Sequence, residues 1–392
     1  MGSGNLMIVQ GGGPTAVFNA SLGSAIEEAK GQAEIGRIYG ARYGMRGLVQ
    51  GDVVELDRLT ADELRLLHSS PGAALGSSRH KPSDEDFDRM AATLRRLDVR
   101  QMIFMGGNGT MRGASVVSER CRKLGFEVQI VGVPKTVDND IALTDRCPGF
   151  ASAARYMAQS TRDLGMDIRS LPQPVTILEV IGRSIGWLAA ATALGKDREN
   201  DAPHIVFLPE KPFCAEQFLA NLDAIVTKIG WAIVVCSEGI LNADGSLVYE
   251  LTDPTHLDPL KRPMTGGVGQ FLAEMVGTSL KIRCRSEKPG LIARAAMAHV
   301  SAQDQKDAVL VGRAGVRALA AGETEKMVSL LPLTNSGKCG YELVPLNKVA
   351  DVERQFPAEW IQDAVIPVGE SFFEYARPLV GDLTPYFVRF TN

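Results

Sequence analysis

The residues best suited to chemistry lie in the stretch PKTVDND (134–140). Asp138 and Asp140 bracket an asparagine in a turn, and Lys135 stands three residues before Asp138. One carboxylate of such a pair can accept a proton from a hydroxyl nucleophile while the other holds a metal ion or orients its partner. The lysine can neutralise phosphoryl charge. The alternative is a solvated turn in which Asp and Asn side chains bond only to the local backbone.

Two glycine clusters supply places where an anion could bind. GGGPT (11–15) and GGNGT (106–110) each follow an apolar run and precede helical sequence. Glycines let the backbone approach an anion, and a helix N-terminus favours negative charge. Neither cluster has the spacing of a P-loop or of GxGxxG, and a tight strand-to-helix turn explains either one equally well. The second cluster carries an amide, Asn108, where a phosphate-handling turn usually keeps a carboxylate for magnesium.

Basic residues occur at two further places. Gly182 and Arg183 follow a predicted strand, so the planar guanidinium could reach a phosphoryl group there. The stretch 280–296, LKIRCRSEKPGLIARAA, gathers three arginines and two lysines in an otherwise neutral chain. It is a candidate site for an anionic substrate. A surface arginine and a solvated basic face are the ordinary alternatives.

Short apolar runs alternate with helical sequence along the chain and would position these residues. The runs are apolar throughout, as in a sheet covered on both faces, which predicts a doubly wound parallel sheet in the α/β class. Ligands bind at the carboxyl ends of such strands, where the polar and glycine-rich turns occur. The predicted strands are 6–10, 34–41, 100–107, 128–135, 174–180, 204–210 and 231–239, and the predicted helices include 16–30, 61–68, 84–97 and 110–125.

Composition bounds the class of protein. The 392 residues are 45% hydrophobic and 22% charged, which suits a globular protein of two or three domains. The formal net charge of −4 gives no sign of a nucleic-acid or membrane partner. No signal peptide or membrane span is expected. The six scattered cysteines form no metal motif and suit reduced thiols in the cytoplasm, and the five histidines are isolated.

These motifs together resemble the phosphofructokinase family, and in particular its longer, often diphosphate-using branch. The resemblance runs from about residue 6 to about 375 and implies two Rossmann-like α/β domains. Residues 1–147 with roughly 292–320 would bind the donor phosphates, and 148–291 with roughly 321–392 would bind the sugar phosphate. A cytoplasmic homodimer or homotetramer acting in glycolysis is implied as well. The motifs are GGGPTAVFNAS (11–21), LGSSRHK (75–81), GGNGTMRGA (106–114), GVPKTVDNDIA (132–142), ILEVIGRSIGW (177–187), FLPE (207–210), SEG (237–239), GVGQFLAE (267–274) and residues 292–319.

The resemblance implies phosphoryl transfer, with Mg²⁺, to the 1-hydroxyl of fructose 6-phosphate, an alcohol-acceptor phosphotransferase reaction that needs positioning and charge neutralisation. Asp138 would be the base, and Arg285 and Arg294 would hold the sugar's own phosphate. The implied catalytic residues are Asp138, Arg183, Lys135 and Thr136. Those implied for the donor are Gly13, Arg79, Gly107, Asn108, Gly109, Thr110 and Gly113. Those implied for the acceptor are Asp140, Gly182, Glu210, Arg285 and Arg294, with Asn108 and Asp140 as metal ligands.

Four residues depart from the family pattern, of which Ile181, in place of a methionine, is a volume-conserving change. Asn108 stands where most members carry a metal-binding aspartate, and its amide oxygen can ligate magnesium but adds no charge. Pro174 and Leu291 replace an arginine and a histidine that bind phosphate in short bacterial forms. A different acceptor, either another sugar phosphate or a polyol, is therefore an alternative. A non-catalytic, ligand-binding homologue is a further one.

The phosphoryl donor depends on a few positions. Diphosphate-using relatives typically have an aspartate where Gly109 sits, and its carboxylate fills the space of a nucleotide's α-phosphate. Gly109 and Gly113 resemble the small residues of nucleotide users, so they favour ATP. Lys135 and the branch resemblance favour diphosphate. The prediction is ATP, with diphosphate as the alternative.

Overall fold

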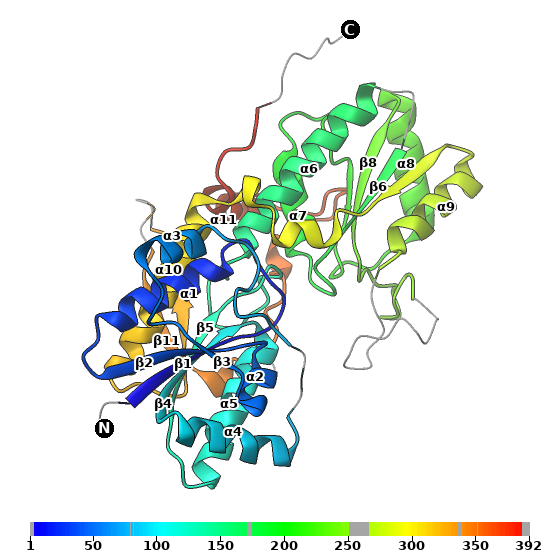
Figure 1. Cartoon of the computed structure of the whole chain (residues 1–392). Helices are drawn as coiled ribbons and strands as arrows, with labels where there is room; N and C mark the ends of the chain where they lie inside the picture. The colour runs from blue at the N-terminus through cyan, green and yellow to red at the C-terminus, as the bar shows by residue number, and fades with distance from the viewer. Residues whose placement is uncertain are drawn as a thin grey trace. The chain divides into compact units, whose positions relative to one another are not determined.

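The computed structural model describes residues 4–78, 80, 82–170, 175–250, 266–334, 337, 339–350 and 352–385. The chain forms two compact units, and each contains two separate segments. The first unit comprises Met1–Phe150 and Arg294–Arg354, and the second comprises Ala151–Ala293 and Gln355–Asn392. The α/β fold is that of the predicted class, with strands and helices alternating along the chain (Figure 1).

A seven-stranded sheet forms the centre of the first unit, and its five inner strands are parallel. The two edge strands are short and antiparallel to their neighbours, so the sheet is mixed at its edges only. The inner strands read as continuous apolar runs because helices cover both faces. The order is β11 (Tyr341–Pro345), β10 (Lys326–Leu330), β5 (Gln129–Pro134), β4 (Val99–Gly106), β1 (Gly4–Gln10), β2 (Ile35–Ala41) and β3 (Val53–Glu55).

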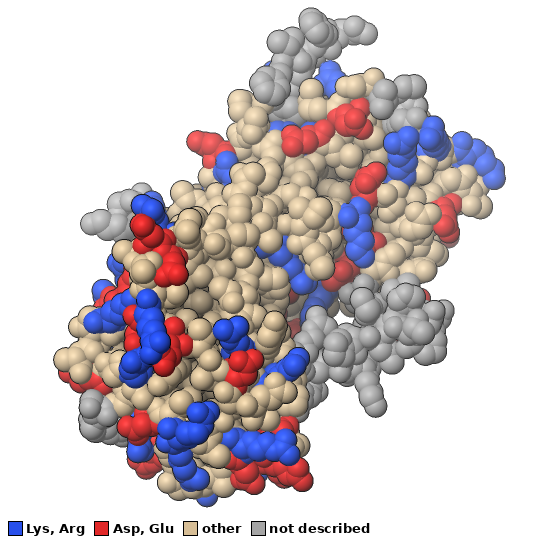
Figure 2. Space-filling view, viewed as in Figure 1, with Lys and Arg blue, Asp and Glu red and all other residues tan. Residues whose placement is uncertain are grey.

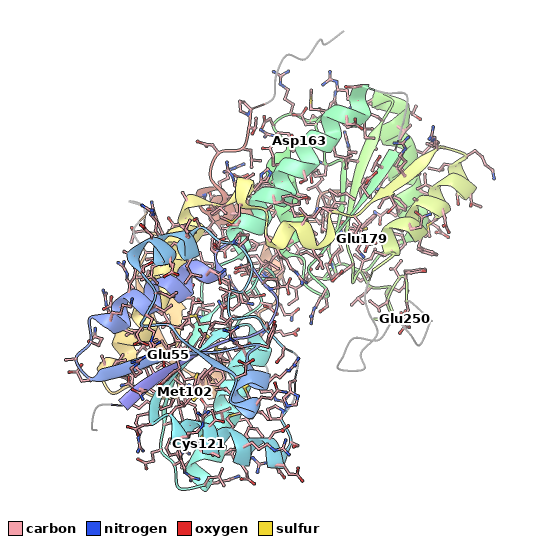
Figure 3. All side chains as sticks on the ribbon, in the orientation of Figure 1. Glu55, Met102, Cys121, Asp163, Glu179 and Glu250 are labelled. Carbon is pink, nitrogen blue, oxygen red and sulfur yellow. The ribbon has the colours of Figure 1, made fainter. Side chains whose placement is uncertain are left out.

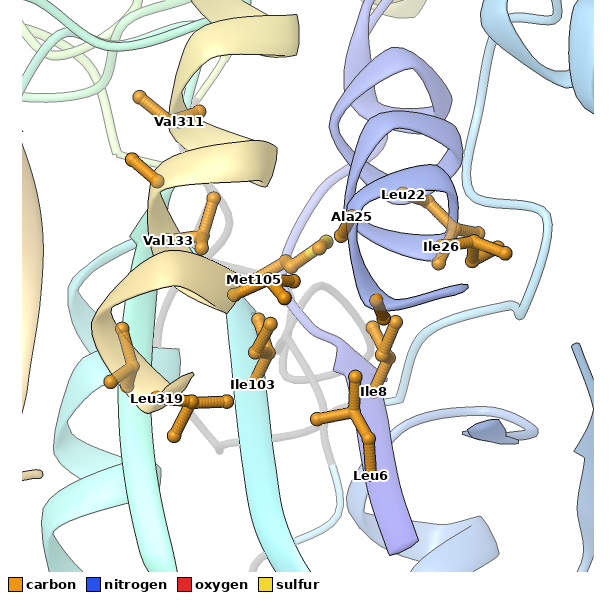
Figure 4. Close-up of a cluster of buried hydrophobic side chains, with 14 of the residues drawn as sticks. Leu6, Ile8, Leu22, Ala25, Ile26, Ile103, Met105, Val133, Val311 and Leu319 are labelled. Atoms are coloured by element: carbon orange, nitrogen blue, oxygen red, sulfur yellow. The ribbon is translucent and has the colours of Figure 1, made fainter. Parts of the chain in front are cut away.

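Helices α1 (Phe18–Lys30), α3 (Ala61–His68) and α10 (Ala302–Ala320) cover one face of this sheet, and α2 (Met45–Gln50), α4 (Asp84–Arg96) and α5 (Asn108–Lys123) cover the other (Figure 1). Successive strand residues point to opposite faces, so β1 divides its side chains between two cores. Leu6 and Ile8 pack with α1 and α10, as Figure 4 shows, whereas Met7 and Val9 belong to the core under α4 and α5. The sheet is therefore held from both sides.

The second unit is built on a four-stranded parallel sheet in the order β7 (Ile205–Phe207), β8 (Ala232–Ser237), β6 (Val175–Val180) and β9 (Cys284–Glu287). Its core contains strand residues and the apolar faces of α8 and α9. Trp187 is fully buried among four aromatic rings of the C-terminal segment, which fix that segment to this unit. The helices are α6 (Phe150–Ser170), α7 (Trp187–Ala191), α8 (Ala215–Ile229), α9 (Val268–Leu280) and α11 (Glu370–Val380).

Glu179 on β6, labelled in Figure 3, fixes the start of α9. Its carboxylate is 2% exposed and accepts hydrogen bonds from the backbone N–H groups of Gly267 and Gly269, both at 2.9 Å. Lys288 pairs with the same carboxylate at 2.6 Å. The charge of Lys288, one of the basic residues of the 280–296 stretch, is therefore paired with a buried carboxylate, although its own side chain is exposed.

Three further cations of that stretch lie at the surface. Basic side chains gather over the part of the second unit that carries α9 and β9 (Figure 2), where Lys281, Arg283 and Arg285 are exposed. On the viewed face of the first unit, acidic and basic side chains are intermixed (Figure 2). The near-neutral composition thus hides one local basic surface.

Most predicted elements are present, with ends shifted by one or two residues. The predicted strand 204–210 is shorter, at Ile205–Phe207. One boundary is wrong: residues 321–354 were assigned to the second domain, yet they belong to the first unit. The reason is that β10 pairs with β5 and β11 pairs with β10, which completes the first sheet.

All six cysteines are free, as expected of reduced thiols. Among the described residues, no helix is both long enough and apolar enough to cross a membrane.

A buried ion pair ties the two segments of the first unit together. The Arg146 guanidinium donates to both carboxylate oxygens of Asp307 on α10, at 2.6 and 2.9 Å. The two side chains are 2% and 3% exposed. Nearby, Gly149 N–H donates to Asp304 Oδ1 at 2.8 Å. These bonds hold α10 against the loop that follows β5.

Asp307→Ala should therefore lower the free energy of unfolding by about 3 kcal/mol, because the buried guanidinium loses two charge-assisted hydrogen bonds while it keeps the pair with Asp145 and the bond to the Leu331 carbonyl. Chemical denaturation measures this loss. The matched control is Arg313→Ala, which removes a half-exposed pair with Glu27 and should cost under about 1 kcal/mol. Equal losses in the two variants would contradict the assignment.

Candidate active site

The glycine turn after β1 meets the start of α5 at close range. A Cβ atom at Gly11 would lie 2.5 Å from Thr110 Oγ1, and one at Gly106 would lie 2.2 Å from the same atom. Gly12 adopts a φ of +76°, which suits glycine. The Thr110 side chain thus occupies the space between the ends of β1 and β4, and glycine is required on both sides of it. Thr110 was predicted to bind the donor, and the structure shows a packing role for its side chain.

The first turn of α5 is open on one side. Gly107 is its N-cap residue, so no side chain covers the first N–H groups of the helix. Within the described chain, a Cβ atom at Gly109 or at Gly113 would meet no atom within 4 Å. Residues four apart lie on the same side of a helix. Gly109 and Gly113 therefore line one unfilled side of α5.

Asn108, the first residue of α5, is hydrogen-bonded to Asp140. Its amide nitrogen donates to the Asp140 carbonyl oxygen at 3.0 Å and to Asp140 Oδ2 at 3.1 Å. An aspartate at position 108 could not donate either bond. The amide of Asn108 thus fixes the orientation of the Asp140 carboxylate.

The amide oxygen of Asn108 and the second carboxylate oxygen of Asp140 are buried. Asn108 Oδ1 and Asp140 Oδ1 have no hydrogen-bond partner among the described residues. Burial and the nearby charge of Asp138 raise the pKa of Asp140 to about 6. Buried oxygens without donors fit a hard cation such as Mg²⁺, which takes one or two protein carboxylates and completes its shell with water and phosphate. In the described part of the chain no group of three acidic, His or Cys side chains could hold a metal, so Asn108 and Asp140 would form a partial ligand set.

The turn after β5 positions Asp138. Asn139 adopts a φ of +57°, and its Oδ1 accepts a hydrogen bond from Cys147 N–H at 3.0 Å, which anchors the turn. The Asp138 N–H donates to Thr136 Oγ1 at 3.1 Å. Thr136 and Asn139 thus form the local frame that holds Asp138. The alternative of a solvated, purely local turn does not describe Asn139, which is fully buried and bonds to the backbone eight residues further along the chain.

Lys135 is buried at the centre of this group. Its side chain is 2% exposed, and Nζ lies 4.5 Å from the centroid of the Phe18 ring. The ammonium donates a hydrogen bond to the Gly13 carbonyl oxygen. Burial lowers the pKa of Lys135 to about 8, and the Asp138 carboxylate opposes that shift. Lys135 thus joins the turn after β5 to the glycine turn after β1.

In the second unit, the ends of β6 and β8 converge at Arg183. Gly182 and Arg183 have φ values of +142° and +53°. Arg183 N–H donates to Glu238 Oε1 at 3.3 Å, and Ser237 Oγ donates to the Arg183 carbonyl at 2.9 Å. The Arg183 side chain is left exposed. Glu238 was not among the predicted site residues, although SEG directly follows a buried strand, which is the signal that could have indicated it.

The remaining predicted residues have varied surroundings. Glu210 accepts from Gly186 N–H at 2.8 Å, and burial raises the pKa of its carboxyl. Arg285 lies exposed on β9 in the second unit. Arg294 belongs to the first unit and lies against Gly13. Arg79 and Pro174 lie outside the described residues, so the prediction for Arg79 stays a prediction.

The structure therefore brings ten predicted site residues together at the carboxyl edge of the first sheet, and four others belong to the second unit. Within the first unit, the group is Gly13, Gly107, Asn108, Gly109, Thr110, Lys135, Thr136, Asp138, Asp140 and Arg294, with Gly113 one turn further along α5. Glycine turns, a buried cation and two carboxylates at one sheet edge form a site suited to a phosphorylated ligand.

Comparison with known proteins also indicates a protein that acts on phosphorylated ligands. A model described as phosphofructokinase matches residues 5–321. A pyrophosphate–fructose 6-phosphate 1-phosphotransferase of Xanthomonas campestris is 34% identical, over 98% of this chain and 93% of its own. A sulfofructose kinase of Alkalicoccus urumqiensis is 32% identical over 91% of each chain. An ATP-dependent 6-phosphofructokinase of Amycolatopsis methanolica is 30% identical, over 82% of this chain and 70% of its own.

A crystal structure of a pyrophosphate-dependent phosphofructokinase from Marinobacter aquaeolei superposes with a TM-score of 0.87 at 32% identity, covering 98% of this chain and 94% of the other. The fold and these matches define a two-unit α/β phosphotransferase with an alcohol group as acceptor. The chain belongs to the phosphofructokinase family, which confirms the resemblance seen in its motifs.

The pKa of Lys135 gives a testable pH dependence. The ammonium is protonated below about pH 8 and loses its charge as the pH rises through that value. If the charge helps to bind phosphate, kcat/KM for the donor should fall above about pH 8. Steady-state kinetics from pH 6 to 10 measure this. Lys135→Arg should abolish this fall in kcat/KM at high pH, because a guanidinium stays charged. If the fall in kcat/KM above about pH 8 were unchanged in that variant, its cause would be the titration of another group.

Proposed function

We propose that the protein transfers the terminal phosphoryl group of ATP to the 1-hydroxyl of fructose 6-phosphate. The observation that carries this proposal is the grouping of Asp138 and Asp140 with the buried Lys135 at the glycine turns of the first sheet. Phosphoryl transfer needs positioned groups and charge neutralisation more than covalent catalysis. The first unit would bind the donor, and the second, with Arg183, Glu210 and Arg285, would contribute to the acceptor.

Asp138 would act as the base. The substrate hydroxyl oxygen forms a bond to the terminal phosphorus as the bond to the leaving phosphate oxygen breaks, and the hydroxyl proton goes to the Asp138 carboxylate. Lys135 would neutralise charge on the transferring group. Mg²⁺, held by Asp140 and Asn108 through their unpartnered oxygens, would neutralise donor phosphate charge.

The open side of α5 supports ATP as donor. Gly109 and Gly113 leave space along the first two turns of the helix, and neither adds negative charge near a nucleotide's α-phosphate. Diphosphate is the second candidate. It is supported by the names of the relatives at 32–34% identity that cover nearly the whole chain, and by Lys135.

The acceptor proposal rests on the same relatives, whose names specify fructose 6-phosphate. The sulfofructose kinase relative and the 66% exposed Leu291, which stands where a phosphate-binding histidine occurs in short family members, support a different sugar as second candidate. Measuring kcat/KM for ATP and diphosphate against fructose 6-phosphate, 6-deoxy-6-sulfofructose, sedoheptulose 7-phosphate and myo-inositol tests both choices. A higher kcat/KM for any other acceptor would overturn the proposed substrate.

A homodimer or homotetramer in the cytoplasm accompanies this proposal and is supported by family membership and by the free cysteines. Light scattering on purified protein measures the oligomeric state, and a monomer at micromolar concentration would contradict it.

Asp138→Asn should lower kcat by roughly 10²–10⁴-fold, because an amide of the same shape cannot accept the hydroxyl proton. Stopped or coupled assays measure kcat, and circular dichroism checks that the fold is retained. Asp88→Asn on the exposed side of α4 is the matched control and should leave kcat unchanged. A near-normal kcat in Asp138→Asn would remove Asp138 as the base.

Gly109→Asp should shift donor preference from ATP toward diphosphate by at least about tenfold, because a carboxylate near the α-phosphate costs roughly 1.4 kcal/mol or more. The position has open space and an ordinary φ, so the fold should tolerate it. The isosteric Gly109→Asn separates bulk from charge. The ratio of kcat/KM values for the two donors is the measurement, and an unchanged ratio in both variants would refute the role of this position.

A further inference from the structure

In the second unit, the loop between the 3₁₀ helix η1 (Thr192–Gly195) and β7 turns backbone carbonyl groups toward one lysine. Lys196 Nζ donates hydrogen bonds of 2.5, 2.6 and 3.2 Å to the carbonyl oxygens of Glu199, Asp201 and Pro203. An ammonium group has three N–H donors and no acceptor, so these bonds use its whole capacity. The loop therefore closes around the side chain of its own first residue.

The acceptors are of the kind that bind a monovalent cation. All three are uncharged backbone oxygens of alternate residues, and together they form a carbonyl cage. In potassium channels, backbone carbonyl oxygens replace the hydration shell of the ion. A lysine ammonium is a compact positive charge. The Nζ atom in this loop therefore stands where a potassium or ammonium ion could bind.

The chain around the carbonyl cage is held by contacts that do not involve the ammonium. The Asp201 carboxylate is buried and accepts from the N–H groups of Asp197 and Arg198, at 3.3 and 2.8 Å. Arg162 on α6 donates to the Gly195 carbonyl oxygen at 3.0 Å and pairs with the Asp197 carboxylate at 2.7 Å. The cage should therefore persist as a site when the lysine side chain is shortened.

The same loop leads into β7. His204 N–H donates to the Ile233 carbonyl oxygen at 2.9 Å, and Ile233 N–H donates to His204 Nδ1 at 3.0 Å. The imidazole must be neutral to accept this bond. Burial and then the nearby charge of Lys196 lower the pKa of His204 to about 4, so the ring is neutral at pH 7. The caged ammonium thus lies beside the bonds that fix the start of β7 on β8.

We propose that this loop is a monovalent cation site whose ion is the tethered ammonium of Lys196. Its ligand class is a small, singly charged cation such as potassium or an alkylammonium ion, and the lysine supplies that charge permanently. Free potassium is therefore not needed to close the loop. The inference goes beyond the proposed function and does not depend on it.

Chemical rescue of a truncated lysine tests this. Lys196→Ala removes the atoms from Cγ to Nζ, which n-propylammonium can replace. Cleavage by an arginine-specific protease after Arg198, which is exposed in the same loop, reports opening of the loop. At pH 7 Lys196 is charged, because burial lowers its pKa only to about 8. Without the ammonium, cleavage should become roughly 10- to 100-fold faster, since charge-assisted hydrogen bonds are lost.

Added cations should close the loop in the variant. The chlorides of n-propylammonium, ammonium and potassium should each slow cleavage of Lys196→Ala, and n-propylammonium should be the most effective because it also fills the space. Choline chloride at the same ionic strength should not, because choline is too large, and n-propanol should not, because it is uncharged. Wild-type cleavage should be the same in every solution, because the site is already filled.

Lys228→Ala is the matched control. Lys228 on α8 pairs with the exposed carboxylate of Glu199 at 2.6 Å, so it contacts the same loop through a side chain at the surface. Its removal should change the rate of cleavage less than about twofold, because exposed ion pairs contribute little. Added cations should not alter that rate.

A wild-type rate of cleavage in Lys196→Ala, or a faster rate that neither n-propylammonium nor potassium lowers, would overturn the inference. Equal rescue by n-propanol would assign the effect to packing, and wild-type cleavage that depends on potassium would show that the lysine does not fill the site; either result contradicts the proposal. If Lys196→Ala does not fold, its refolding yield is compared in n-propylammonium and choline chlorides. A higher yield in n-propylammonium supports the cation site, and equal yields refute it.

Discussion

The buried ammonium of Lys135 is the feature on which the geometry of the candidate active site depends. A charged group with 2% exposure needs close partners, because removing it from water is costly. It donates to the Gly13 carbonyl and lies against the Phe18 ring, and the negative charges of Asp138 and Asp140 favour its ammonium form. Because Lys135 at the end of β5 bonds to Gly13 in the turn after β1, it joins the ends of two strands that are separated by more than a hundred residues in the chain. The carboxylates themselves are held locally, Asp138 by the turn that Thr136 and Asn139 anchor and Asp140 by the Asn108 amide.

A second constraint is close backbone approach. Gly11 and Gly106 are required because Thr110 packs between them, so these glycines have a structural role. Among the described residues, Gly109 and Gly113 have no neighbour that requires a glycine, and they border unfilled space. The GGNGT motif therefore contains Gly106, which close packing requires, and Gly109, which borders unfilled space. Only the second kind bears on the choice of donor.

Much of the fold could be predicted because its signals are local. Continuous apolar runs indicated the buried parallel strands, and α3 and α4 begin at capping boxes formed by Thr60 with Glu63 and by Ser83 with Asp86. The PKTVDND turn likewise indicated the carboxylate pair. Strand β9, CRSE, was missed because it is short and polar, and β10 was placed in the wrong domain because its partner β5 is distant in sequence.

The parts of the site that sequence could not supply depend on distant partners as well. The amide of Asn108 bonds to Asp140, 32 residues away, so its role in orienting a carboxylate was not visible in the GGNGT motif. Arg294 follows Arg285 by nine residues yet belongs to the other unit. The most direct test of the account is a crystal structure with Mn²⁺ and a non-hydrolysable ATP analogue. We predict an anomalous peak for the metal beside Asp140 Oδ1 and Asn108 Oδ1, with the terminal phosphate against the Gly13 turn. A metal bound away from both residues, or a donor bound away from that turn, would contradict the account.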